Sequence, residues 1–224
     1  TTIFRFREFR GVLTPLFISM IRSVSTKQDE ILSDILTLNS LALFDADITY
    51  GNGNFYKAIP KPNLKFDIDP QSSDVVPACS TKLPVASSCL SSVVFDPPFL
   101  TYVRSGRTGN GKMVMSNMYG GYWRYDELEN HYKKTLTEVH RVLRSKGILV
   151  FKCQDIIHNH KMHPTHINVV NWCEQMFRLK DMFILTAKHR MPVPEKQGEA
   201  KRVQRHARIH HSYFLVLEKL NGRN

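Results

Sequence analysis

Residues 91–99 have the sequence SSVVFDPPF, an apolar run that ends at an aspartate, two prolines and a phenylalanine. Two consecutive prolines end a strand and remove two backbone donors, which leaves their carbonyls as acceptors. In open α/β sheets, ligands bind outside the carboxyl ends of the strands. We therefore expect Asp96, Pro97, Pro98 and Phe99 to form a rigid cluster of carboxylate, carbonyl and ring at a ligand site. A strand-ending turn capped by Asp96 is the alternative.

The rest of the chain alternates apolar runs with helical spacing, which is typical of a mostly parallel sheet. At 224 residues the chain is long enough for one α/β domain, which we expect to occupy residues 26–224. Helices are predicted at 27–38, 125–144 and 165–179. Strands are predicted at 41–47, 64–69, 75–79, 91–96, 147–153, 182–188 and 211–219.

Three further segments differ in composition from these elements. Residues 101–124 are rich in Gly, Ser, Thr and Asn and predict a lid loop, with a disordered insertion as the alternative. The Arg-rich residues 1–25 indicate either a transit peptide or an extension that packs on the domain or touches nucleic acid. Residues 188–211 are predicted to form a basic loop between the last two strands.

The formal net charge is +11 and the isoelectric point is near 9.6. A balance this basic favours polyanionic partners, and we interpret it as nucleic-acid binding, with Arg202 and Arg205 as candidate phosphate contacts. A solvated basic surface is the alternative. No apolar run is long enough to span a bilayer, so no membrane partner is expected.

The four cysteines form no CxxC pair, so we expect reduced, mostly buried thiols and no metal site. The expected compartment is the cytoplasm, or an organelle if residues 1–25 are a transit peptide.

The DPPF cluster suits reactions at an amine whose lone pair is delocalised into a ring, such as the exocyclic nitrogen of adenine or cytosine. Asp96 and the Pro97 carbonyl could each accept one N–H and orient the lone pair towards a methyl donor, while Phe99 stacks on the base. Lys152 and Gln154, at the end of the next strand, could line the same pocket or simply end the strand.

Two segments upstream are candidates for holding a cofactor. The glycines of residues 47–55, DITYGNGNF, allow a close backbone approach to a ligand, although an ordinary turn would also contain them. A carboxylate at the end of the next strand can accept the hydroxyls of a ribose. The candidate cofactor-binding residues are Asp47, Thr49, Gly51, Gly53, Phe55, Asp67 and Asp69.

In this order, residues 40–218 resemble the amino-group methyltransferases of nucleic acids, the adenine-N6 and cytosine-N4 enzymes with the signature (D/N/S)PP(Y/F/W). The resemblance implies a class I methyltransferase (Rossmann-like) fold with seven strands, mostly parallel, an antiparallel closing strand and helices on both faces. It also implies S-adenosyl-L-methionine as the cofactor. The loop before residue 83 departs from the pattern, because Ser80 or Thr81 stands where an acid or amide usually contacts the cofactor's adenine.

The favoured hypothesis is therefore methylation of the adenine-N6 amine of DNA. RNA adenine-N6 methylation, DNA cytosine-N4 methylation, a catalytically silent nucleic-acid-binding subunit and protein glutamine methylation are the alternatives. Because no large target-recognition domain is present, specificity would come from the two loops or from a protein partner.

Overall fold

The computed structural model describes residues 20–101, 121–187 and 204–221. Its helices are α1 (Gln28–Leu38), α3 (Tyr125–Val142) and α4 (Thr165–Cys173), with a short 3₁₀ turn η1 (Asn54–Tyr56). The main sheet contains β1 (Val24–Ser25), β2 (Ala46–Asp47), β3 (Leu64–Asp67), β4 (Val76–Pro77), β5 (Leu90–Phe95), β6 (Leu143–Cys153), β9 (Phe177–Thr186) and β10 (His211–Lys219). A separate hairpin consists of β7 (Ile156–His158) and β8 (Lys161–His163).

The main sheet has the strand order β1-β9-β10-β6-β5-β2-β3-β4. Strand β10 lies antiparallel between β6 and β9, and the other neighbouring pairs are parallel. This is the class I methyltransferase fold, with the late strand inserted antiparallel. The seven expected strands are present, and β1 adds an eighth at one edge, from residues that the sequence assigned to the N-terminal extension.

The strand order reverses at β2, which pairs with β3 on one side and with β5 on the other. Such a reversal opens a crevice at the carboxyl ends of the strands. In the register of β2 with β5, Asp47 lies opposite Val94, two residues before Asp96. The segment after β2 and the DPPF motif after β5 therefore leave the sheet side by side.

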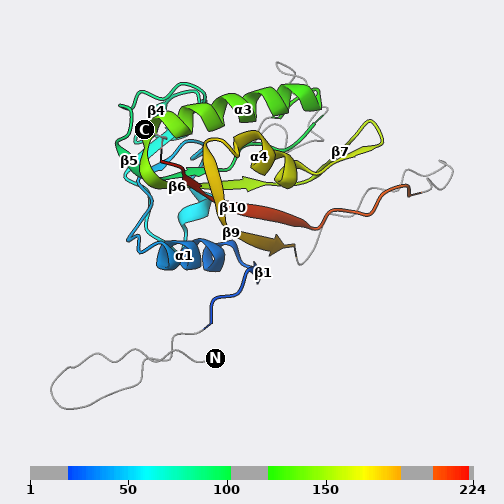
Figure 1. Ribbon diagram of the computed structural model, residues 1–224, viewed down its shortest axis with the longest axis horizontal. Helices are drawn as coiled ribbons and strands as arrows, with labels where there is room; N and C mark the ends of the chain where they lie inside the picture. Colours follow the sequence, from blue (N-terminus) through cyan, green and yellow to red (C-terminus); the bar gives the residue numbers. More distant parts are fainter. Residues whose placement is uncertain (1–19, 102–120, 188–203, 222–224) are drawn as a thin grey trace, which may run out of the picture.

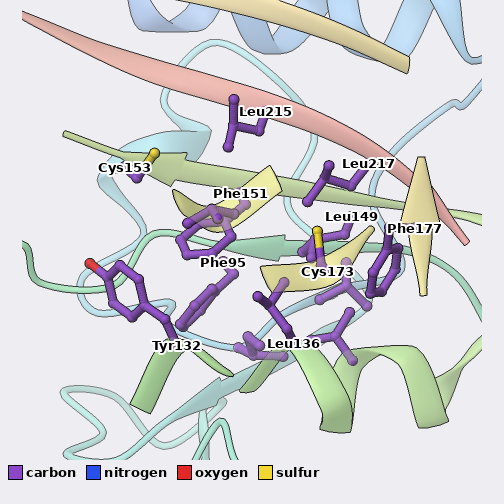
Figure 2. Close-up of a cluster of buried hydrophobic side chains, with 14 of the residues drawn as sticks. Phe95, Tyr132, Leu136, Leu149, Phe151, Cys153, Cys173, Phe177, Leu215 and Leu217 are labelled. Carbon is purple, nitrogen blue, oxygen red and sulfur yellow. The ribbon is translucent and has the colours of Figure 1, made fainter. Parts of the chain in front are cut away.

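Helices cover both faces of the sheet, as Figure 1 shows: α3 and α4 lie on one face and α1 on the other. Each face has its own apolar cluster, the larger one under α3 and α4. In that cluster the rings of Phe95, Tyr132 and Phe151 meet, with centroids 4.8 Å apart for Phe95–Phe151 and 5.1 Å for Tyr132–Phe151 (Figure 2). This packing fixes the end of β5 against α3 and β6.

Several predicted boundaries were wrong. The helix predicted at 165–179 ends at Cys173, and Phe177 instead begins β9, because its backbone pairs with Lys219 of β10. The helix predicted to reach residue 144 ends at Val142, since Leu143 already pairs with Leu90. Only Ala46–Asp47 of the strand predicted at 41–47 has ladder pairing.

The four thiols are free; Cys153 and Cys173 are buried, whereas Cys89 is exposed, contrary to a mostly buried set. Most of the predicted lid and much of the basic loop, with Arg202, lie outside the described residues, as do residues 1–19. None of the helices that the structure describes is long and apolar enough to cross a membrane.

Leu136 of α3 is fully buried in the larger cluster, so Leu136→Ala should lower the free energy of unfolding by about 2–5 kcal/mol. Leu38→Ala is the matched control, because Leu38 ends α1 with 44% of its surface exposed. It should cost less than about 1 kcal/mol. Urea unfolding measures both, and equal losses would contradict the assignment of α3 to the core.

Candidate active site

A buried carboxylate organises the turn after β2. Asp47 is only 2% exposed. Its Oδ2 accepts a hydrogen bond from the Tyr56 hydroxyl at 2.7 Å, and its Oδ1 accepts the Thr49 N–H at 2.8 Å. Burial raises the pKa of Asp47 to about 7, although these hydrogen bonds act in the opposite direction. Asp47 thus holds the turn from inside and does not present a free carboxylate to a ligand.

Thr49 joins this turn to the DPPF motif. The backbone N–H of Asp96 donates to Thr49 Oγ1 at 2.7 Å, and Ile48 N–H donates to the carbonyl of Val94 at 3.0 Å. Thr49 therefore fixes the position of Asp96 relative to the glycine turn, and its contact with a cofactor stays a prediction.

Both glycines of the turn adopt left-handed backbone angles, with φ of 53° at Gly51 and 68° at Gly53. A Cβ at Gly53 would lie 2.5 Å from the hydroxyl of Tyr50, so that position requires glycine. A Cβ at Gly51 would meet nothing within 4 Å, which leaves its surface open to a ligand. The two glycines thus serve different needs, close packing at Gly53 and open approach at Gly51.

Asp67 lies beside the open glycine. Its Oδ2 accepts the Gly51 N–H at 2.7 Å, and its Oδ1 accepts the Asp69 N–H at 2.9 Å. Asp67 is half-buried, whereas Asp69 is exposed. Each Asp67 oxygen retains a lone pair, so Asp67 is the better placed of the two carboxylates to receive hydroxyl groups next to the glycine turn.

Asp96 reaches the surface at the end of β5. Its side chain is 22% exposed, and its Oδ2 lies 3.3 Å from the Nζ of Lys152. Burial raises the pKa of Asp96, and the Lys152 ammonium opposes that rise. One carboxylate oxygen therefore has a cationic partner at the rim of the sheet.

Lys152 connects this carboxylate to two other elements. Its Nζ donates to Gln28 Oε1 at 3.0 Å, at the start of α1, and lies 4.7 Å from the ring centroid of Phe55. The predicted site residues Lys152 and Phe55 thus lie together beside Asp96. No sequence pattern indicated Gln28, which is 124 residues from Lys152 along the chain.

The two prolines have different partners. The Pro98 carbonyl accepts the hydroxyl of Tyr132 at 3.1 Å, a contact that the sequence did not predict. Within the described residues the Pro97 carbonyl accepts no hydrogen bond, so its acceptor capacity is retained. Phe99 packs half-buried against the core.

A cavity of about 390 Å³ lies next to Phe99. Its lining includes Leu100, Thr101, Gln154 and Asp155. Gln154 lies on the wall of this cavity, and its Nε2 donates to the His211 carbonyl at 2.8 Å. A larger groove of about 700 Å³ lies elsewhere, between α1 and residues 20–25, and contains none of the predicted site residues.

A buried polar network supports one wall of the smaller cavity. Asp155 Oδ1 lies 2.7 Å from His166 Nδ1, and the His166 ring stacks on Tyr213 with centroids 4.0 Å apart. The hydroxyl of Tyr213 lies 2.9 Å from His211 Nε2. These side chains come from β10, from α4 and from the segment after β6, so no local pattern in the sequence could reveal the network.

Two loop residues, Ser80 and Tyr122, are tied to helix α3. Ser80 Oγ lies 2.8 Å from His131 Nε2 and 3.1 Å from Thr135 Oγ1, so it faces the helix. The Tyr122 hydroxyl contacts His131 Nδ1, and its N–H donates to the Leu100 carbonyl at 2.9 Å. Tyr122 therefore anchors the chain where the predicted lid returns to the fold. Arg205 is exposed on the described end of the basic loop.

The sequence matches no protein-family model and none of the curated proteins at a significant level. Among solved structures it is similar to a candidate DNA modification methylase from Thermus thermophilus, at 18% identity and a TM-score of 0.42 over 66% of this chain and 54% of that one. It is also similar to the N-methyltransferase NodS from Bradyrhizobium japonicum, at 11% identity and a TM-score of 0.49 over 86% of this chain and 96% of that one. At such identities the likeness concerns the fold alone, and the chain spans about half the length of the Thermus protein.

The raised pKa of Asp47 predicts a pH dependence of stability. Because the folded state holds a proton that the unfolded chain releases near pH 4, stability is highest below about pH 4 for this group and falls as pH rises to about 7. The steepest slope is roughly 1.4 kcal/mol per pH unit. Asp47→Asn should flatten it, since an amide does not titrate.

Urea unfolding across pH 4 to about 8 measures this slope. Asp181→Asn, which changes an exposed carboxylate of β9, is the control and should keep the slope of the unchanged protein. An unaltered slope in Asp47→Asn would contradict the account.

Proposed function

We propose that this chain is an S-adenosyl-L-methionine-dependent methyltransferase that acts on the exocyclic amino group of a nucleic-acid base, with adenine-N6 of DNA as the favoured target. The observation that carries the proposal is the partly exposed Asp96 carboxylate, next to the Pro97 carbonyl and held by Thr49 beside the glycine turn. Two acceptors at the rim of a class I methyltransferase sheet suit an NH₂ group.

The residues of the crevice fit the proposed cofactor. Gly51 leaves open space, and the Asp67 carboxylate beside it can accept ribose hydroxyls. S-adenosyl-L-methionine, when bound, supplies an activated methyl group on a positively charged sulfur. The lining of the two cavities described above includes neither Asp96 nor Gly51.

The residues of the chain act mainly by orientation. Asp96 and the Pro97 carbonyl each accept one N–H of the amine, which directs the nitrogen lone pair away from both acceptors. The charge of the Asp96 carboxylate and the dipole of the Pro97 carbonyl stabilise the positive charge that develops on nitrogen. Lys152, 3.3 Å from Asp96, favours the ionised carboxylate and holds one of its oxygens in place.

The nature of the substrate rests on charge and on the motif. A net charge of +11 favours a polyanion, and an aspartate before PP suits a base amine. A base in a duplex must leave the stack to reach such a site. Incubating the protein with labelled donor and separate DNA and RNA pools, followed by mass spectrometry of the nucleosides, distinguishes adenine-N6 of DNA from adenine-N6 of RNA and cytosine-N4 of DNA.

Asp96→Ala should lower methyl transfer at least about 100-fold and leave cofactor affinity nearly unchanged, because the carboxylate contacts the amine rather than the cofactor. Radiolabel transfer and calorimetry measure the two quantities. Asp181→Ala, at an exposed position of β9, should change neither. Loss of cofactor binding in Asp96→Ala would mean that the role assigned to Asp96 is wrong. If the unchanged protein took up no cofactor, that result would indicate a catalytically silent subunit.

Asp67→Asn should weaken cofactor binding about tenfold, because it removes a charged acceptor from the ribose and leaves one oxygen for the two N–H groups of Gly51 and Asp69. Asp69→Asn is the matched change at the exposed neighbour and should have little effect. Calorimetry with S-adenosyl-L-methionine compares them. A larger effect at Asp69 would reverse the assignment.

A further inference from the structure

Two segments without a single acidic residue lie together beyond the carboxyl end of β6. One is the β7–β8 hairpin, residues 156–163, and the other is residues 204–210, which lead into β10. They are joined where His206 Nε2 donates to the His160 carbonyl at 2.9 Å. Figure 1 shows both segments extending to the same side of the sheet. We refer to them together as the hairpin surface.

The hairpin surface is rich in exposed positive charge. Lys161, Arg205 and Arg208 are exposed, as are the imidazoles of His160 and His210. Among the residues that the structure describes, these three cations make no salt bridge. Surface cations gathered at one place attract a polyanion, and the two described segments themselves carry no carboxylate that would cancel their field.

The hairpin is held in one orientation. Its turn has left-handed angles at Asn159 (φ 49°) and His160 (φ 59°), as a two-residue type I′ turn requires. Histidine is strained in such a position, where glycine is not. The ring of His163 stacks on Tyr125 of α3, with centroids 3.8 Å apart. The strained turn therefore presents a histidine on a hairpin that is fixed to the helix layer.

The hairpin surface borders the cavity next to the DPPF motif. The cavity of about 390 Å³ is lined by Phe99–Thr101, Gln154–Ile157 and His206–Ile209. A nucleic-acid strand whose backbone lay on the hairpin surface would thus pass directly beside Phe99. No acidic side chain from either segment would oppose its phosphates.

We propose that the β7–β8 hairpin and residues 204–210 form one phosphate-binding surface, which holds the backbone of the nucleic-acid strand next to the target base. The inference rests on the proposed function for its ligand. Contacts to phosphates fix position and orientation and supply affinity that depends on salt, without reading sequence. The hairpin surface would therefore set where the strand lies, while the crevice at Asp96 selects the base.

The test is binding of a fluorescein-labelled single-stranded DNA oligonucleotide to the full chain without cofactor, followed by anisotropy at several salt concentrations. Lys161→Ser with Arg208→Ser should weaken binding about tenfold and reduce the salt slope by roughly 1 to 2. Lys61→Ser with Arg144→Ser is the matched control. It removes the same charge from exposed positions near the amino ends of β3 and β6. Its effect should be small.

A second variant separates binding from folding. His160→Gly suits the left-handed turn and should keep or raise thermal stability, while it removes an imidazole from the hairpin surface and weakens oligonucleotide binding. Equal weakening in the control pair would overturn the proposal, because it would show an effect of net charge alone. Unchanged oligonucleotide binding in Lys161→Ser with Arg208→Ser would also overturn it. A loss of binding to phosphatidylserine vesicles in the same variant would then indicate an anionic membrane surface, not a nucleic acid, as the ligand of the hairpin surface.

This experiment is independent of catalysis. If the unchanged protein transfers no methyl group but binds the oligonucleotide through the hairpin surface, the proposed function fails and the surface stands. If it methylates DNA while both double variants bind alike, the surface fails and the proposed function stands.

Discussion

The hydrogen bonds of the buried Asp47 carboxylate are the constraint on which the candidate site depends. The carboxylate accepts the Tyr56 hydroxyl and the Thr49 N–H and so fixes the turn after β2. The hydroxyl of Thr49 in turn accepts the N–H of Asp96. The glycine turn and the DPPF motif are therefore one rigid unit, although 47 residues separate Thr49 from Asp96. Rigid placement matters because orientation contributes to a reaction only when the reacting groups are held within a small error.

Lys152 acts on the same unit by charge. It favours an ionised Asp96 in surroundings that otherwise raise its pKa, and the ring of Phe55 and the Oε1 of Gln28 hold its ammonium. A cation so near the amine would also oppose the positive charge that grows on nitrogen. Its contact with Asp96 is 3.3 Å, longer than a strong charge-assisted hydrogen bond.

Features that depend on neighbouring residues in the sequence could be predicted, whereas features that depend on contacts between distant residues could not. The end of β5 was predictable because Pro97 and Pro98 cannot continue a strand, and the glycine turn because Gly51 and Gly53 tolerate positive φ. Gln28 and Tyr132 were missed because their partners lie far away in the chain, and Tyr56 because the way the turn folds back onto Asp47 is not visible in its sequence. The start of β9 was misplaced because an apolar residue such as Phe177 fits a buried helix and a buried strand equally well, and only pairing with β10 decides.

The distribution of charge explains how a basic protein can keep carboxylates at its centre. Asp67 and Asp96 lie at the carboxyl edge of the sheet, partly buried, and would repel a phosphate. The exposed cations Lys161 and Arg208 lie at the periphery. For the proposed nucleic-acid substrate, this distribution favours a pose with the backbone on the rim and only a neutral base at the centre. Under the same proposal, a pose that brought the backbone to these carboxylates would be disfavoured, so the charge distribution would contribute selectivity as well as affinity.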